Sequence, residues 1–446
     1  MSQADVDDLV NHYTMLQEGW SVCEETEVYA GLVVPNGNSL CPFHRWFHLK
    51  EAYSASLFDH IMKDFGAPSG NALRVFDPFS GSATTLLSAI DYGASRSLQC
   101  SVYGVERNPF LWELGTAKIE ARLGGSDLAA PLKAAYELVL DEFKRVDTSK
   151  LELPDQATLS NGKYFPKTSV QDLIALRESI SLSSEGTIRS ILRACLASSV
   201  EVCSRLRRDG RALRYVPGRI PRAALAVFGE RVSLAIEDLH CTEPTDASVG
   251  LHLGDGRQPP SCVRGDGYDW IIFSPPYPNN IDYTEVYKTE AWVLGCYSTS
   301  REMRNQRLST VRSHPSVRFE RNYFYDSLGL ASEVEAIISP VLDTVPVDRY
   351  SLDRKEMIRG YADDMLKTLH ECRGLISPQG RLAFIVGNSV HGSGGNSFII
   401  AADVLMSALA ELAGWKVSEI RIARRLRRRK IESDFLRESV VVLDPS

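Results

Sequence analysis

The segment 268–277, Tyr-Asp-Trp-Ile-Ile-Phe-Ser-Pro-Pro-Tyr, carries the residues best suited to chemistry. Its apolar part predicts a buried strand that ends at a polar and aromatic tip. The Ser274 hydroxyl and the Pro275 carbonyl would supply two hydrogen-bond acceptors there. Pro275 and Pro276 fix the backbone, because each proline locks φ and offers no N–H. Tyr277 adds a flat face. Such a tip could hold the amino group of a planar ring. Together with a cofactor-binding pattern far upstream, it suggests group transfer to nucleobases.

A second candidate site lies far upstream, where residues 75–87 read Val-Phe-Asp-Pro-Phe-Ser-Gly-Ser-Ala-Thr-Thr-Leu-Leu. A strand ends at Asp77, a loop of small residues follows around Gly81, and a helix begins near Thr84. The N-terminus of a helix offers free N–H groups to a carboxylate or a phosphate. Taken alone, the loop is explained equally well as a tight turn. A phosphate-binding loop is excluded, because the Lys-Ser/Thr that follows such loops is missing.

Two further strand ends carry acidic residues. Glu106, in Gly-Val-Glu-Arg-Asn-Pro, follows the second strand, where an acid can accept hydrogen bonds from ribose hydroxyls. Asp255, in Leu-Gly-Asp-Gly-Arg, follows a third strand and could accept from an adenine amino group. Taken singly, Glu106 is better explained as a helix-start acid and Asp255 as part of a turn. The order of glycine loop, acid, acid and Ser-Pro-Pro-Tyr at successive strand ends is far rarer by chance.

The elements that must position these residues indicate an α/β fold. Seven segments have strand patterns: 73–77, 101–106, 250–253, 269–273, 381–386, 415–422 and 439–443. The first five alternate with helices or a helical stretch, which implies a parallel sheet with helices on both faces. The last two could form an antiparallel pair. Ligands of such sheets bind at the carboxyl ends of the strands, where each of the motifs falls.

Composition limits the class of protein. The chain has 446 residues and a hydrophobic fraction of 44%, which is typical of a globular protein with a substantial core. It lacks a run of about 18 apolar residues, so we expect no transmembrane helix. Its 9 cysteines include no Cys-x-x-Cys pair, which argues against a zinc site and for the cytoplasm. The net charge is -7, so a basic surface for nucleic acid must be local.

Together these motifs resemble the S-adenosylmethionine-dependent DNA methyltransferases that modify exocyclic amino groups, at N4 of cytosine or N6 of adenine. Residues 77–85 resemble their cofactor loop, Asp-Pro-Phe-x-Gly-x-Gly-Thr-Thr, and residues 274–277 resemble their catalytic (Asp/Asn/Ser)-Pro-Pro-Tyr. The resemblance spans residues 40–125 and 250–443. Ala83 replaces the usual second glycine of the loop, and we expect a modest effect on cofactor affinity.

The resemblance implies a seven-stranded Rossmann-like methyltransferase sheet, S-adenosylmethionine as cofactor and DNA as substrate. It implies cofactor contacts from Asp77, Pro78, Phe79, Gly81, Glu106, Asn108 and Asp255, and catalytic roles for Ser274, Pro275, Pro276 and Tyr277. Asp77, Phe79 and Gly81 would line the methionine moiety. Glu106 would hold the ribose, and Asp255 the adenine. The serine form of the catalytic motif favours N4 of cytosine over N6 of adenine.

Three parts of the chain are expected. Residues 1–125 would hold an N-terminal segment and the cofactor-binding half of the methyltransferase domain. Residues 126–248 show helical spacing of apolar residues and would form an all-helical insertion, a candidate for target recognition. Residues 249–446 would form the catalytic half. A cognate restriction or defence-system protein is a further expected partner, and no membrane partner is expected.

Two arginine-rich clusters are candidates for phosphate contact, although charge runs are more often solvated faces. They comprise Arg205, Arg207, Arg208, Arg211, Arg214, Arg219 and Arg222, and Arg421, Arg424, Arg425, Arg427, Arg428, Arg429 and Lys430. Target choice could lie in the helical insertion or in residues 296–350, where Arg301, Arg304, Arg307 and Arg312 recur. Segment 391–396, His-Gly-Ser-Gly-Gly-Asn, could form a mobile lip or a simple flexible loop.

The expected chemistry follows from the amine. Its lone pair is delocalised into the ring, and the two fixed acceptors would draw the amine hydrogens out of the ring plane. The base must leave its stack, which costs a few kcal/mol, and stacking on Tyr277 would return about 1–3 kcal/mol. An RNA methyltransferase and a catalytically silent adaptor remain alternatives. Methylation at C5 of cytosine is disfavoured because the sequence has no Pro-Cys dipeptide.

Overall fold

A computed structural model describes residues 3–67, 70–209, 213–265, 267–279, 281–392, 397–428 and 432–446, with the side chains of residues 3–6 left aside. Its strands are β1 (Val22–Glu24), β2 (Ala72–Asp77), β3 (Gln99–Glu106), β4 (Leu206–Arg208), β5 (Leu213–Tyr215), β6 (Ser248–Leu253), β7 (Tyr268–Phe273), β8 (Ile376–Gly387), β9 (Ser389–His391), β10 (Phe398–Ile400), β11 (Trp415–Arg425) and β12 (Arg437–Pro445).

The longer helices are α1 (Gln3–Leu16), α3 (Leu57–Phe65), α4 (Thr84–Ser95), α5 (Pro109–Gly124), α6 (Ala129–Phe143), α8 (Lys167–Ser183), α9 (Gly186–Val200), α10 (Ala224–His240), α12 (Lys288–Leu294), α13 (Ser300–Leu308), α15 (Ala331–Asp343), α16 (Ser351–Arg373) and α17 (Ala402–Leu412). Short helices are α2 (Thr26–Tyr29), α7 (Ala157–Ser160), α11 (Tyr283–Val286) and α14 (Phe324–Leu328). None of the described helices is long and apolar enough to cross a membrane.

The central sheet has eight strands in the order β1-β11-β12-β8-β7-β2-β3-β6. Strands β8, β7, β2, β3 and β6 run parallel. Strand β12 is antiparallel to both β8 and β11. The predicted α/β class is therefore confirmed, as is the antiparallel pairing of the last two predicted strands.

One strand, β1, was not among the seven expected. It pairs in parallel with β11 at the edge of the sheet. It has three residues, Val-Cys-Glu, which is too short a segment to show the alternation from which strands are predicted. The sheet therefore has eight strands rather than seven.

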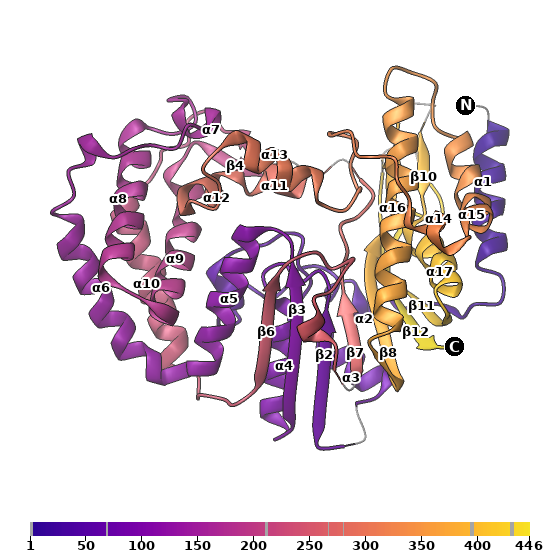
Figure 1. Cartoon of the computed structure of the whole chain (residues 1–446), viewed down its shortest axis with the longest axis horizontal. Helices are drawn as coiled ribbons and strands as arrows, with labels where there is room; N and C mark the ends of the chain where they lie inside the picture. Colours follow the sequence, from indigo (N-terminus) through magenta and orange to yellow (C-terminus); the bar gives the residue numbers. More distant parts are fainter. Residues whose placement is uncertain are drawn as a thin grey trace.

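Side chains of each central strand alternate between two cores, as the pleat of a strand requires. In β7, Trp270 and Ile272 belong to the core beneath α3, α4 and α5. Ile271 and Phe273 belong to the opposite core, which contains residues of α1, α15, α16 and α17. Figure 1 shows the sheet with helices on both sides. Burial on both faces explains why these strands are apolar throughout rather than in alternation.

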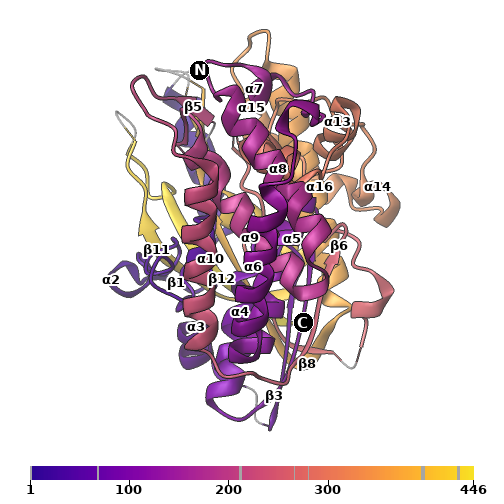
Figure 2. The same ribbon diagram turned by 90° about the vertical axis from the view of Figure 1, so that its left-hand side faces the viewer.

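Helices α6, α8, α9 and α10 pack on one another, and α9 also packs on α5 and α12. They stand side by side at the left of Figure 1 and face the viewer in Figure 2. The region expected to be all-helical also contains the antiparallel pair β4 and β5. Each of these strands has three residues, Leu-Arg-Arg and Leu-Arg-Tyr, and the sequence pattern therefore gave no strand there.

Candidate active site

A cavity of about 360 Å³ lies where β2, β3, β6 and β7 end. This volume falls within the range of small-molecule sites, roughly 300–1,000 Å³. The predicted site residues that line the cavity are Pro78, Phe79, Gly81, Glu106, Asn108, Asp255, Ser274, Pro275, Pro276 and Tyr277. The structure thus brings the glycine loop, both acids and the Ser-Pro-Pro-Tyr tip to one space. Asp77 alone among the predicted site residues does not line it.

Asp77 supports the loop from behind. Its side chain is 2% exposed, and burial raises the pKa of the carboxyl to about 7. The Phe79 N–H donates to Asp77 Oδ1 at 2.8 Å, and the Thr85 hydroxyl donates to Oδ2. Tyr53 bonds to the same Thr85 hydroxyl. Asp77 therefore shapes the glycine loop without lining the cavity, and its expected place along the methionine moiety stays a prediction.

Glu106 joins the loop to the second strand end. Its two oxygens accept from the Gly81 N–H and the Asn108 N–H, both at 2.7 Å. Asn108 in turn caps α5, because its Oδ1 accepts from the Phe110 N–H at 3.0 Å. Burial raises the pKa of Glu106 to about 7. Glu106 is a cavity-lining acceptor whose ionisation falls in the neutral pH range.

Asp255 sits in a turn that packs directly on the glycine loop. A Cβ at Gly256 would lie 1.9 Å from the Pro78 carbonyl oxygen, so only glycine fits there without a shift of the backbone. Arg257 donates from Nε to Asp255 Oδ1 at 2.9 Å and from Nη2 to Oδ2 at 2.7 Å. Although burial opposes ionisation, the Arg257 guanidinium lowers the pKa of Asp255. Arg257 thus holds Asp255 as a carboxylate.

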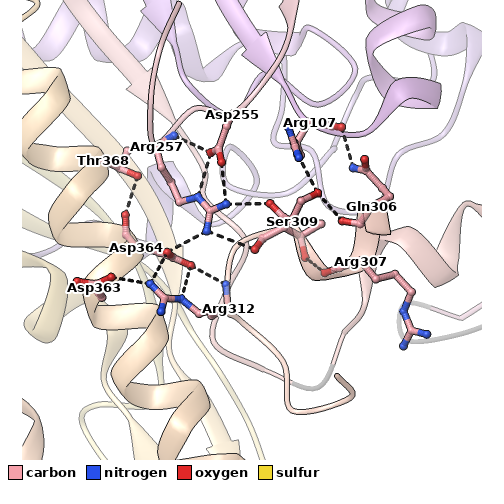
Figure 3. Close-up of polar contacts among 11 residues, drawn as sticks. Arg107, Asp255, Arg257, Gln306, Arg307, Ser309, Arg312, Asp363, Asp364 and Thr368 are labelled. Carbon is pink, nitrogen blue, oxygen red and sulfur yellow. Dashed lines mark hydrogen bonds and ion pairs between the residues drawn. The ribbon is translucent and has the colours of Figure 1, made fainter. Parts of the chain in front are cut away.

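Arg257 also holds the segment after α13 against the cavity (Figure 3). Its Nη2 donates to the Ser309 carbonyl at 2.8 Å, and its Nη1 lies 2.9 Å from Asp364 Oδ1 on α16. Arg312 pairs with Asp363 and Asp364 at 2.6 and 2.8 Å. Residues of this segment that line the cavity are Ser309, Thr310, Val311, Ser313 and His314. The sequence assigned them no place in the site.

The Ser-Pro-Pro-Tyr tip is held in place by residues of β8, β11 and β12. The Ser274 hydroxyl donates to the Ile385 carbonyl at 3.1 Å and lies 3.3 Å from the Tyr277 hydroxyl. The Tyr277 hydroxyl donates to Glu438 Oε1 at 2.9 Å. Arg424 donates to Glu438 Oε2 from Nε at 3.0 Å and from Nη2 at 2.6 Å. Glu438 and Arg424 both line the cavity.

Sequence reasoning gave Glu438 and the cavity-lining Glu51 no place in the site, and it named Arg424 only as a candidate for phosphate contact. The sequence carried a signal for Glu438, because this acid directly precedes the predicted strand 439–443. In the structure Glu438 is 4% exposed. A buried carboxylate in such a strand requires a partner. The partners, Tyr277 and Arg424, come from distant segments that only the fold brings together.

Ion pairs neutralise much of the arginine clusters. Arg208 pairs with Glu290, and Arg421 pairs with Asp64 and Glu419. Further paired arginines are Arg214, Arg219, Arg222, Arg307, Arg312, Arg424 and Arg425. Arg207, Arg301, Arg304, Arg427 and Arg428 are exposed. Arg211, Arg429, Lys430 and residues 393–396 of the expected lip lie outside the described residues.

Comparisons with known proteins agree with this geometry. The chain is 24% identical over 425 residues to the Type II methyltransferase M.AvaI of Nostoc sp. and of Anabaena variabilis, covering 86% of this chain and 81% of theirs. It is 24% identical over 455 residues to the Type II methyltransferase M.BsoBI of Geobacillus stearothermophilus, covering 90% of this chain and 84% of that protein.

No family model matches the chain. The rRNA methyltransferase aviRa from Streptomyces viridochromogenes superposes with a TM-score of 0.30 and 12% identity, over 92% of this chain and 91% of that one. The methyltransferase relatives confirm the resemblance drawn from the motifs, and with it S-adenosylmethionine as the methyl donor that the resemblance implies.

Proposed function

We propose that this chain transfers a methyl group from S-adenosylmethionine to the exocyclic amino group of a flipped DNA base, with N4 of cytosine favoured over N6 of adenine. One observation carries the proposal: the glycine loop, Glu106 and the Ser274–Tyr277 tip line a single cavity. A cofactor held by the first two would present its methyl group to a base amine held by the third.

The residues present fit the cofactor. Glu106 and Asp255 supply acceptors for ribose hydroxyls and an adenine amine, and Phe79 and Leu111 add apolar walls. Gly81, with φ of 52°, occupies a backbone conformation that L side chains rarely adopt. When bound, S-adenosylmethionine supplies an electrophilic methyl group on a sulfonium.

Ser274 is arranged to accept rather than donate. A hydroxyl has a single hydrogen, and both of its near acceptors, the Ile385 carbonyl and the Tyr277 hydroxyl, belong to the protein. Tyr277 uses its own hydrogen on Glu438. The lone pairs of Ser274 Oγ are therefore available to an amine hydrogen. An acceptor that fits the pyramidal amine better than the planar one lowers the barrier to in-line transfer.

Two features support cytosine as the target. The motif has serine at its first position, the form that the resemblance associates with N4 of cytosine. Arg424 lies in the same cavity, and a guanidinium has five N–H donors, of which Glu438 takes two. Beside its amine, cytosine presents two acceptors, N3 and O2, whereas adenine presents N1 followed by a C–H. A guanidinium matches the first pattern better.

Radiolabelled cofactor tests the proposal directly. Purified protein should transfer label to DNA in preference to RNA, and Ser274→Ala and Tyr277→Ala should each lower the rate strongly while thermal unfolding stays close to that of the parent. Ser233→Ala, at an exposed position on α10, is the matched control and should retain full activity.

Each contrary outcome selects a specific alternative. Preferential labelling of RNA would make the chain an RNA methyltransferase. Failure to bind the cofactor in calorimetry would make it a nucleic-acid-binding adaptor. Full activity in Ser274→Ala would remove that hydroxyl from the mechanism.

A further inference from the structure

Glu51 lines the cavity but has no role in the proposed transfer step. The Tyr287 hydroxyl donates to its Oε2. Tyr287 is 1% exposed and packs between Phe47 and Phe110, with ring centroids 5.9 Å away in each case. Burial raises the pKa of Glu51. A carboxylate in such surroundings is costly to ionise unless a cation joins it.

The protein's own cations do not fill that role among the described residues. Arg208, whose charge is felt at Glu51, is committed to Glu290 and lies 3.3 Å from Glu201. Lys50 donates its Nζ to the Arg208 carbonyl at 2.7 Å. No described lysine or arginine forms an ion pair with Glu51. A cationic ligand in the cavity would supply this counter-charge and favour the carboxylate form of Glu51.

The position of Glu51 relates it to the cofactor loop. Leu49 Cδ2 would lie 3.6 Å from a Cβ placed on Gly81. Tyr53 bonds to Thr85, which donates to Asp77. The chain on either side of Glu51 is therefore attached to the glycine loop. The acceptors for the nucleoside end, Glu106 and Asp255, belong to the strand ends beyond that loop.

From this we propose that Glu51 binds the α-ammonium group of the methionine moiety of S-adenosylmethionine, an assignment that rests on the proposed function. That ammonium is a cation with three N–H donors, and Glu51 offers an acidic partner that Asp77, set behind the loop, does not. A charge-assisted hydrogen bond between them stabilises the bound cofactor and orients its amino-acid end.

Two ligands separate this contact from the rest of the site. S-adenosylhomocysteine carries the amino-acid end and no sulfonium charge. 5′-Methylthioadenosine has the same adenosine and thioether but lacks the amino-acid end. Calorimetry of the full chain without DNA should show that Glu51→Gln lowers the affinity for S-adenosylhomocysteine by about 10- to 100-fold, as expected for a hydrogen bond to a charged group. The affinity for 5′-methylthioadenosine should stay within about twofold of the parent value. Glutamine retains an acceptor for Tyr287.

Controls distinguish the failure of this assignment from the failure of the proposed function. Glu106→Gln should lower the affinity for both ligands. Glu302→Gln, at an exposed position on α13, should leave both affinities unchanged. Retained binding of 5′-methylthioadenosine also reports that the Glu51→Gln site is folded.

An unchanged affinity of Glu51→Gln for S-adenosylhomocysteine would overturn the assignment. If methyl transfer alone were then lost, Glu51 would act on the target base instead. A parent protein that binds neither ligand would contradict the proposed function itself.

Discussion

At the residue scale, the proposed role of Ser274 as an acceptor depends on the protein binding the hydroxyl hydrogens of Ser274 and Tyr277. The Ser274 hydroxyl donates a hydrogen bond to the Ile385 carbonyl, and the Tyr277 hydroxyl donates one to the Glu438 carboxylate. Arg424 holds Glu438 in turn. The arrangement explains why a buried carboxylate lies beside the tip: it orients a tyrosine whose own oxygen borders the serine.

A double-mutant cycle on Tyr277 and Glu438 tests this orientation. Tyr277→Phe and Glu438→Gln should each lower kcat by about 10- to 100-fold, because a hydrogen bond to a charged group contributes about 1.5–3 kcal/mol. The double variant should lose little more than either single one, since the two changes remove the same bond. KM for the cofactor should stay the same.

Tyr103→Phe, which removes a hydroxyl bonded to Ser248 at 2.9 Å outside the cavity, is the matched control and should be neutral. Strictly additive losses for Tyr277 and Glu438 would show that they act separately.

The pKa of Glu106 predicts a pH dependence of nucleoside binding. A ribose hydroxyl donates a stronger hydrogen bond to the carboxylate than to the protonated acid, whose remaining acceptor is uncharged. Burial raises the pKa of Glu106 to about 7, so the binding form is lost as pH falls through that value. Affinity for 5′-methylthioadenosine should therefore rise from pH 6 to pH 8, by at most about tenfold per pH unit, and level off above the pKa.

The uncharged variant supplies the check. In Glu106→Gln the affinity measured by calorimetry should be weaker and nearly independent of pH. The same slope in parent and variant would assign the titration to another group, such as Asp77, whose pKa burial also raises to about 7.

At the element scale, the site is a set of strand ends locked together by close backbone contacts. The turn after β6 touches the loop after β2 through Gly256, where a Cβ would meet the Pro78 carbonyl oxygen at 1.9 Å. Gly254, two residues earlier, has its nearest contact at 3.5 Å, from Val105.

Alanine should therefore be destabilising at Gly256 and nearly neutral at Gly254. Gly256→Ala should lower the free energy of unfolding by about 1–3 kcal/mol or more, as overpacking does. It should also lower the affinity for 5′-methylthioadenosine. Gly254→Ala should change both by little, because its Cβ would make an ordinary contact. Denaturant unfolding and calorimetry measure the two effects. Equal behaviour of the two variants would mean that the turn and the loop do not touch.

The strands that form long apolar runs could be predicted from the sequence. All seven predicted strands are present, because each is an apolar run long enough to be recognised. Three-residue strands such as β1 and β4 could not be predicted, since their pairing depends on neighbours rather than on their own residues. The same limit applies to the site. Residues 77–81 and 274–277 are local motifs, whereas Glu51, Glu438 and Arg424 become cavity walls only through tertiary contacts.

At the scale of the whole molecule, the charge distribution has to reconcile a net charge of -7 with a polyanionic substrate. Most arginines of the basic clusters are paired with acids within the fold. Arg427 and Arg428 are exposed and follow Arg424, which lies in the cavity wall. We therefore expect the residues just after β11 to contact phosphates beside the proposed flipped base.

Removing those two charges tests this placement. Arg427→Ala combined with Arg428→Ala should raise KM for DNA without changing the affinity for S-adenosylhomocysteine. The slope of log affinity for DNA against log salt should fall by about 1.8, if each arginine neutralises one phosphate. Lys416→Ala, exposed at the opposite end of β11, should leave the slope unchanged. An unaltered slope in the double variant would place the DNA elsewhere.

The central claim is that one cavity joins a bound methyl donor to a base amine held at Ser274. Base-resolution modification sequencing of DNA from cells that express the parent or Ser274→Ala tests it most directly. We expect N4-methylcytosine at one recurring sequence with the parent, and its loss with the variant. Methylation at C5 of cytosine, or an identical methylation pattern in Ser274→Ala, would contradict it.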